Sequence, residues 1–116
     1  DGDGDLDLLL GDWGGKVQYY ERVSPTDLVA RTGSALNPFH GLQVRGASAP
    51  VAVDWDLDGD LDLVVGERYG QVSYFEHTDV GLVKRDGAGQ NPFHGIDVGM
   101  WAAPQVFDVD GDGDLD

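Results

Sequence analysis

The sequence predicts an all-β protein built from four-stranded antiparallel sheets, arranged as the blades of a β-propeller. Three observations support this prediction: segments of the 116-residue chain recur after 54 or 55 residues, each period holds four short strand-like segments, and an acidic loop follows the first of them. Repeats of this kind are typical of propeller blades. About two blades are present, whereas a closed propeller needs about 4 to 8. We therefore expect the chain to be part of a larger propeller or array, whose other blades come from a parent chain or from other copies.

The internal repeat divides the chain into three parts. The pentapeptide Asn-Pro-Phe-His-Gly occurs at 37–41 and again at 91–95, and Ala-Pro occurs at 49–50 and at 103–104. The expected parts are the three outer strands of one blade with the connection that follows (1–48), a complete blade with an acidic loop at 54–62 (49–86), and a connection with the first strand and acidic loop of the next blade (87–116).

Four strands are expected in the complete blade. They are rich in β-branched and aromatic residues and are bounded by Gly, Pro and Asp, at 49–53, 61–66, 71–76 and 82–85. In the second of them, alternation places Leu61, Leu63 and Val65 on one face, with Asp62 and Val64 on the other. Apolar side chains on both faces are typical of a strand covered on both sides, so we expect this blade to lie between two neighbours.

The acidic loop at 54–62 has the spacing of a calcium-binding loop. Carboxylates stand at loop positions 1, 3, 5 and 9, and Gly59 stands at position 6, where the backbone must turn sharply. Calcium binds about 6 to 8 oxygens, and the carbonyl of Asp60 at position 7 offers one more. An EF-hand also begins in this way, but it needs a carboxylate at position 12 and flanking helices. Position 12 here is Val65, so we interpret the loop as a calcium site within a β-hairpin.

Aspartates of the loop at 54–62 and of equivalent loops at both ends of the chain explain most of its acidity. The net charge is −15, and fourteen of the 22 acidic residues lie in the acidic loops, which leaves the remainder nearly neutral. There is no basic face for a phosphate backbone or an anionic membrane, so neither nucleic-acid binding nor direct membrane insertion is expected. The candidate metal ligands are Asp1, Asp3, Asp5, Asp7, Asp54, Asp56, Asp58, Asp60, Asp62, Asp108, Asp110, Asp112, Asp114 and Asp116.

These motifs resemble a known repeat. The pattern A-P-x-x-x-D-x-D-x-D-G-D-x-D-L-V-V-G-E, followed by Gly-Gln-Val-Ser-Tyr-Phe-Glu, is similar to the FG-GAP/VCBS repeat, the blade type of integrin α-subunit heads and of several propeller lectins. The likeness covers the whole chain. It implies a calcium-binding β-propeller, usually extracellular, that acts in adhesion, glycan binding or scaffolding.

The resemblance also implies a ligand set for each loop. The implied ligands are Asp54, Asp56, Asp58 and Asp62 with the carbonyl of Asp60, then Asp108, Asp110, Asp112 and Asp116 with the carbonyl of Asp114, and in the first loop Asp1, Asp3 and Asp7 with the carbonyl of Asp5. The chain departs from the family in two ways. It lacks the FG and GAP sequence signatures, and it adds the Asn-Pro-Phe-His-Gly element to the long connection.

The remaining polar and aromatic candidates are read as structural. His40 and His94 stand in the repeated pentapeptide, where Asn-Pro starts a turn and the phenylalanine packs between blades. Trp13, at a hairpin tip, either covers the edge of the neighbouring blade or stacks against a sugar, and we favour the first; Trp55 and Trp101 are read as packing residues. No nucleophile elbow, phosphate-binding loop or dinucleotide fingerprint is present, and there is no cysteine.

The expected function is therefore a non-catalytic, calcium-stabilised propeller segment with a structural or adhesive role in an extracellular or cell-surface protein. Its expected partners are neighbouring blades, with a glycan or an extracellular protein as a further candidate. Two alternatives stay open at this point: a lectin-like glycan-binding propeller, and the accessory propeller of a secreted enzyme.

Overall fold

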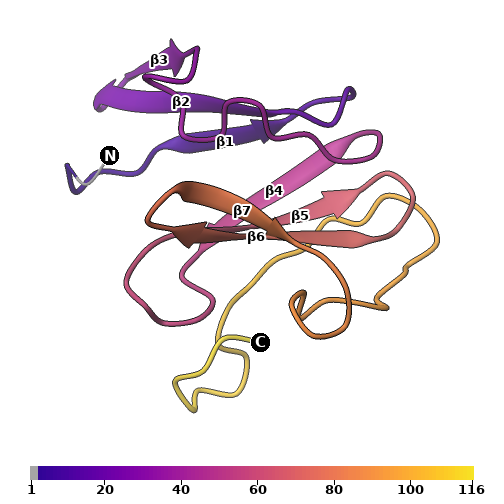
Figure 1. Ribbon diagram of the computed structural model, residues 1–116. Coiled ribbons are helices and arrows are strands. Elements are labelled where there is room, and N and C mark those ends of the chain that lie inside the picture. The colour runs from indigo at the N-terminus through magenta and orange to yellow at the C-terminus, as the bar shows by residue number, and fades with distance from the viewer. Residues whose placement is uncertain (1–2) are drawn as a thin grey trace.

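The computed structural model describes residues 3–116, and this part of the chain forms two antiparallel sheets without any helix (Figure 1). The first sheet has the order β1-β2-β3 and the second the order β4-β5-β6-β7. The strands are β1 (Leu8–Gly11), β2 (Val17–Ser24), β3 (Asp27–Arg31), β4 (Ser48–Val53), β5 (Asp62–Glu67), β6 (Val72–Thr78) and β7 (Gly81–Arg85). The predicted all-β class is confirmed, as are three strands of one blade and four of the next. Within residues 3–116, no helix is long and apolar enough to cross a membrane.

The predicted bounds of the strands hold to within two residues. The prediction that Leu61 lies in the second strand of the blade, on one face with Leu63 and Val65, is wrong. The β4–β5 ladder ends at the pair Val53–Asp62, so Leu61 lies in the loop and is 63% exposed. The ladder stops there because the carboxylate of Asp62 turns inward and accepts hydrogen bonds from β6. The buried faces of β5 are consequently formed by Leu63, Val64 and Val65, which are all completely buried.

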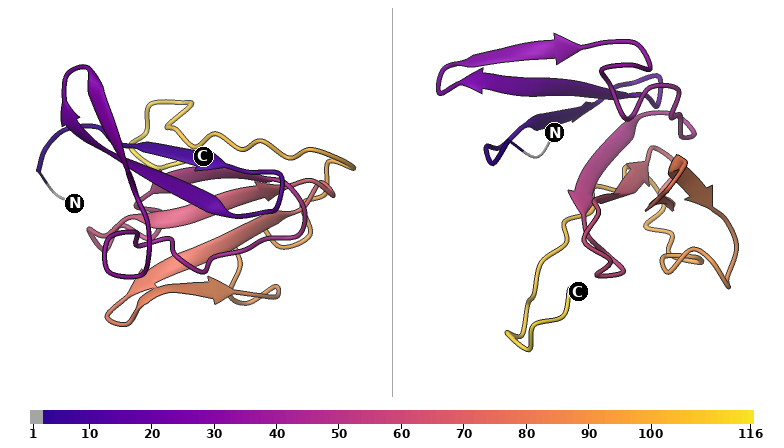
Figure 2. Two further views of the ribbon diagram at one scale, coloured as in Figure 1. Left: turned by 90° about the horizontal axis from the view of Figure 1, so that it is seen from above. Right: turned by 60° about the vertical axis from the view of Figure 1, so that its left-hand side comes forward.

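The hydrophobic core lies between the two sheets. Val17 of β2 and Val44 of the connection pack with Leu63, Val65 and Phe75 of the second sheet. Figure 2 shows the first sheet as a separate layer beside the second, with β4 as the strand of the second sheet that contacts β1. Leu63, Val64 and Val65 are completely buried, and the first sheet is the one neighbour of this blade among residues 3–116, so a second neighbouring blade stays a prediction.

Contacts between consecutive repeats follow the sequence period. Residue Gly11 at the end of β1 lies against the backbone of Ser48, and a Cβ at this position would overlap the Ser48 carbonyl oxygen. One period later, Gly66 lies in the same way against the backbone of Ala102, with Pro104 Cδ at 2.5 Å from the position of a Cβ. We call these two close approaches the seam contacts. Both need a glycine because no side chain fits between the two backbones.

Both Asn-Pro-Phe-His-Gly segments form turns, as expected, and Phe39 packs against the core between the sheets, whereas Phe93 packs within its own blade. Buried Asn37 accepts a 2.8 Å hydrogen bond at its Oδ1 from the N–H of Phe39, and Asn91 does the same for Phe93 at 2.9 Å. The ring of Phe93 packs edge-on against Tyr74, with centroids 6.0 Å apart. The same arrangement in both repeats explains why the pentapeptide recurs.

The predicted first strand of a third blade is not formed as a strand. Residues 101–108 have no strand assignment, although Ala102 donates a 3.1 Å hydrogen bond to the carbonyl of Glu67. In the complete blade, the first strand is held by the strand that follows its acidic loop. Here only the start of that pairing is formed: the N–H of Asp116 donates a 3.2 Å hydrogen bond to the carbonyl of Phe107. Ala102 and Pro104 lie against Gly66 at the seam.

Candidate metal centres in the acidic loops

The loops at 54–62 and 108–116 each gather three carboxylates around one point. Oxygen atoms of Asp54, Asp56 and Asp58 all lie within 4.8 Å of one another in the first of these loops. In the second, the same is true of Asp108, Asp110 and Asp116. Two oxygens that bind one calcium ion at about 2.3 to 2.6 Å are no more than about 5 Å apart, so both groups have the right spacing for a shared cation.

Backbone amides shape both loops around the aspartate at position 1. The carboxylate of Asp54 accepts hydrogen bonds of 3.1 Å from the N–H groups of both Asp58 and Gly59. The carboxylate of Asp108 likewise accepts a 3.0 Å bond from the N–H of Gly113. These bonds fold each loop back on its first aspartate, which brings the side chains at positions 3 and 5 or 9 to the same side.

The glycine at position 6 is required by the backbone conformation. Gly59 has φ of +99° and Gly113 has φ of +98°. Only glycine adopts this region without strain. At position 4 the last loop has Gly111, with φ of +79°, but the complete loop has Leu57 in the left-handed region with φ of +62°. Leu57 is 69% exposed, so packing does not compensate for this strain.

The aspartate at position 9 of the complete loop has a second, structural role. Asp62 is 1% exposed, and its carboxylate accepts a 2.6 Å hydrogen bond from the Tyr74 hydroxyl and a 2.7 Å bond from the N–H of His77. One period earlier, Asp7 accepts equivalent bonds of 2.7 Å from the Tyr19 hydroxyl and 2.8 Å from the N–H of Arg22. These carboxylates connect the end of the acidic loop to the third strand of the blade. The sequence signal for this role is a tyrosine twelve residues after the aspartate in both repeats.

The predicted ligands are therefore only partly brought together. Asp62 is not in the group of three, and Asp60 instead approaches Nδ1 of His77 at 3.4 Å. Asp112 accepts a 3.0 Å hydrogen bond from the N–H of Asp114, and in the first loop Asp3 accepts a 3.0 Å bond from the N–H of Asp5. Asp1 lies outside the described residues.

The donor set fits a hard cation. Every candidate ligand is an oxygen, which is the ligand type that calcium takes. Partial removal from water, followed by the negative charges of Asp58 and Asp62, raises the pKa of Asp56 above its usual value. The charges of Asp58 and Asp62 are thus the second cause of the raised pKa, after desolvation. A divalent cation would remove the repulsion between these charges.

A comparison with known protein families identifies the repeat. A family model described as an FG-GAP-like repeat matches residues 1–65, which is more than half of the chain. The chain belongs to the FG-GAP-like repeat family. No curated protein and no solved structure matches the chain significantly. The matched part of the chain includes the first sheet, the connection after it and the acidic loop at 54–62.

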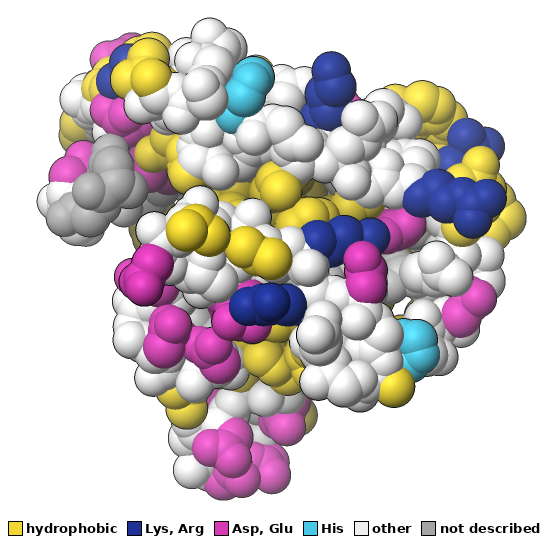
Figure 3. All heavy atoms as spheres, viewed as in Figure 1, with side chains coloured by type: hydrophobic (Ala, Val, Ile, Leu, Met, Phe, Trp, Pro, Cys, Tyr) yellow, Lys and Arg dark blue, Asp and Glu magenta, His cyan; other side chains and the backbone are white. Residues whose placement is uncertain are grey.

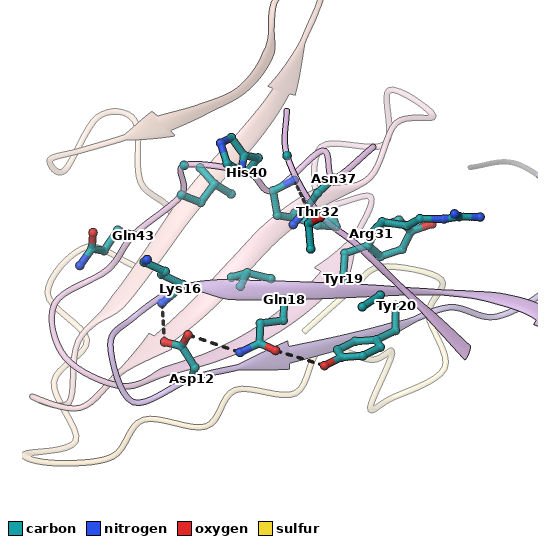
Figure 4. A pocket seen from close by; sticks show the side chains of 16 residues that line it. Asp12, Lys16, Gln18, Tyr19, Tyr20, Arg31, Thr32, Asn37, His40 and Gln43 are labelled. Carbon is teal, nitrogen blue, oxygen red and sulfur yellow. Dashed lines mark hydrogen bonds between the residues drawn. The ribbon is translucent and has the colours of Figure 1, made fainter. Parts of the chain in front are cut away.

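This FG-GAP-like repeat protein also has a cavity away from its acidic loops. A cavity of about 410 Å³ lies between β2, the end of β3 and the connection at 32–43 (Figure 4). Around it, the side chain of Gln18 donates to Asp12 at 3.5 Å and accepts from the Tyr20 hydroxyl at 3.2 Å. His40 lies on its rim, and among residues 3–116 its ring has no carboxylate partner to orient it. The cavity wall is thus a set of turn and strand residues that bond to one another.

The buried tyrosines predict how the stability of this FG-GAP-like repeat depends on pH. Burial, and then the hydrogen bond to Asp62, raise the pKa of Tyr74 well above its usual value of 10.0. Burial and the bond to Asp7 do the same for Tyr19. A raised pKa contributes stability that is fully present below pH 10 and is lost as pH rises towards the folded pKa, because the unfolded chain ionises first.

We therefore expect the free energy of unfolding to fall as pH rises above about 10. Urea unfolding between about pH 8 and pH 11 measures this dependence, and Tyr74→Phe should make it shallower because the substituted ring cannot ionise. A slope that is the same in Tyr74→Phe and in the unsubstituted chain would show that the bond to Asp62 does not control the tyrosine.

Proposed function

We propose that this chain is a non-catalytic, calcium-stabilised segment of a β-propeller that serves as a structural or adhesive scaffold in an extracellular or cell-surface protein. The observation that carries the proposal is the pair of repeat-related loops, each of which holds oxygens of three carboxylates within 4.8 Å. Groups of three carboxylates in loops one period apart support a role in every blade rather than a single specialised site.

The proposed mechanism is folding that is linked to metal binding. The loop joins β4 to β5, and Asp62 at its end is hydrogen-bonded to β6, so an ion in the loop would fix the inner hairpin of the blade. A ligand that binds only the folded state stabilises it by RT ln(1 + [L]/Kd), which is about 2.7 kcal/mol at one hundred times Kd. Calcium-binding modules outside cells work with Kd values of about 0.1 to 1 mM, which supports the proposed location.

Neighbouring blades are the proposed partners. Leu8 and Leu10 of β1 are 37% and 43% exposed, whereas Leu63 and Val65, which stand one period later, are completely buried. The buried pair is covered by Val17 and Val44 of the preceding repeat. Leu8 and Leu10 can therefore pack against another blade in the same way. That blade belongs either to the parent chain or to a second copy.

Calcium should raise the thermal stability of the chain. We expect an increase in Tm when chelator is replaced by millimolar calcium, with about two ions bound per chain in native mass spectrometry. Asp54→Asn and Asp108→Asn should each remove about one ion, because each takes a charged ligand from one loop. Asp79→Asn, an exposed position in the β6–β7 turn, is the matched control and should bind as the unsubstituted chain does. An unchanged Tm and no bound ion would refute calcium stabilisation.

A further inference from the structure

Aromatic and arginine side chains meet at the end of the strands that lies opposite the acidic loops. Trp13 comes from the β1–β2 turn, Arg68 and Tyr69 from the β5–β6 turn, and Arg45 and Trp101 from the connections that lead to the first strand of each repeat. We call these five residues the aromatic–arginine cluster. In Figure 3, dark blue and yellow side chains gather at the right edge, where Figure 1 places the hairpin tips, while acidic side chains gather at the left and bottom.

The rings of the cluster surround one guanidinium group. The Arg68 guanidinium carbon lies 5.2 Å from the ring centroid of Trp13, 5.4 Å from that of Trp101 and 5.8 Å from that of Tyr69. The two tryptophan rings are 5.1 Å apart. Arg45 stacks over Tyr69 at 5.1 Å. All three rings keep much of their surface in solvent, with 67% of Trp13 and 47% of both Tyr69 and Trp101 exposed.

In the described part of the chain, Arg45 and Arg68 lack the acidic partners that Arg31 and Arg85 have. Arg31 pairs with Glu21 at 2.7 Å and, one period later, Arg85 pairs with Glu76 at 2.8 Å. Within residues 3–116, Arg68 has neither an ion pair nor a side-chain hydrogen bond, and its buried Nε has no acceptor. Arg22, the remaining arginine, bonds through its Nε to the carbonyl of Ser24, whereas the Nε of Arg68 is buried without an acceptor. The free positive charge is therefore available to an anionic group from outside.

The side chains of this cluster do not recur with the repeat. Structural contacts in the chain recur with the period, as the seam contacts and the Asp–Tyr pairs do. In the cluster, by contrast, Arg68 stands one period after Trp13, and Trp101 stands one period after Ala47. Equivalent positions of the two repeats thus carry different side chains. Within residues 3–116, these side chains come together at one place, where the two blades meet. A feature that the repeat does not need is the expected signature of a specific site.

We propose that the aromatic–arginine cluster binds a sugar residue that carries a carboxylate. Exposed indole and phenol rings offer flat apolar faces for the C–H face of a pyranose, and a guanidinium binds a carboxylate through two parallel hydrogen bonds. The ligand carries a single acidic residue at the end of a neutral glycan, because the net charge of −15 repels extended polyanions. This site lies at the opposite end of the strands from the calcium loops and does not depend on them.

Nuclear magnetic resonance of the full 116-residue chain tests the proposal, with cellobiouronic acid as the probe. We expect the indole N–H signals of Trp13 and Trp101 to shift saturably, while that of Trp55, which packs on Phe93, stays in place. The methyl ester of the same sugar is the matched ligand control and should bind about tenfold more weakly or worse, because it has lost the charged acceptor.

Two variants separate binding from folding. Arg68→Gln should weaken binding of the acid by about tenfold while leaving the rest of the amide spectrum in place. Arg22→Gln is the matched control outside the cluster and should bind normally. Trp13→Ala, at a mostly exposed position, provides a second variant if Arg68→Gln disturbs the fold. The proposal is overturned if the ester binds as well as the acid, if Arg68→Gln binds normally, or if no indole shifts. Equal binding of acetyl-aspartyl-glycine amide would reassign the site to peptide carboxylates.

Discussion

Replacing Gly66 with alanine will destabilise the chain by about 3 kcal/mol, because overpacking at a close backbone contact forces the two repeats apart. The new Cβ would overlap the carbonyl of Ala102 and lie 2.5 Å from Pro104 Cδ. Backbone atoms cannot move aside as a flexible side chain can. The shift would also break the hydrogen bonds that Trp101 and Ala102 donate across the seam at 2.8 and 3.1 Å.

Urea unfolding at fixed calcium concentration measures this loss. Gly89→Ala is the matched control, because Gly89 has no atom within 4 Å of a Cβ and no left-handed φ, and it should change stability by less than about 0.5 kcal/mol. If Gly66→Ala is as mild as Gly89→Ala, residues 101–104 do not lie against β5 in solution.

Replacing Asp62 with alanine should cost about 4 kcal/mol. The substitution removes a buried carboxylate and leaves the Tyr74 hydroxyl and the N–H of His77 without an acceptor, and each hydrogen bond to a charged group contributes about 1.5 to 3 kcal/mol. The loss should persist in the presence of a chelator, because these bonds do not involve a metal ion.

A double-mutant cycle distinguishes this role from calcium binding. Tyr74→Phe removes one of the two bonds alone, and its effect should be strongly non-additive with that of Asp62→Ala because the two groups share the bond. Asp79→Ala, at an exposed turn position, is the surface control. Full additivity, or a loss that disappears without calcium, would show that Asp62 acts as a metal ligand only.

The strand pattern and the turns could be predicted because they depend on local sequence. Alternation in β5, glycine at loop position 6 and the repeated pentapeptide all act over a few residues. The two sheets and the turn at Asn37 follow from these signals. Leu61 was assigned to the wrong environment because periodicity does not show where a ladder ends, and here a buried carboxylate ends it.

The features that were not predicted depend on contacts between distant residues. The bond between Asp62 and Tyr74 spans twelve residues, and the contact between the tilted rings of Trp13 and Trp101 spans most of the chain. Trp101 packs against Trp13 as expected, with ring centroids 5.1 Å apart, but its position beside Arg68 with 47% of its surface exposed is not predicted by the sequence. Single-sequence patterns carry no information about which hairpin tips converge, so this cluster emerges only from the arrangement of the blades.

The seam contacts have a consequence for how genes that encode such arrays can change. Each seam contact joins a glycine to a residue 36 or 37 positions later. Both seam contacts therefore depend only on the position of these residues within the repeat. Unequal crossing-over that inserts or deletes one whole period regenerates all of these contacts, wherever in the repeat the exchange occurs. An exchange out of phase would place a side chain where glycine is needed. A change in length by one whole blade therefore preserves seam contacts of this kind without a compensating substitution at the seam.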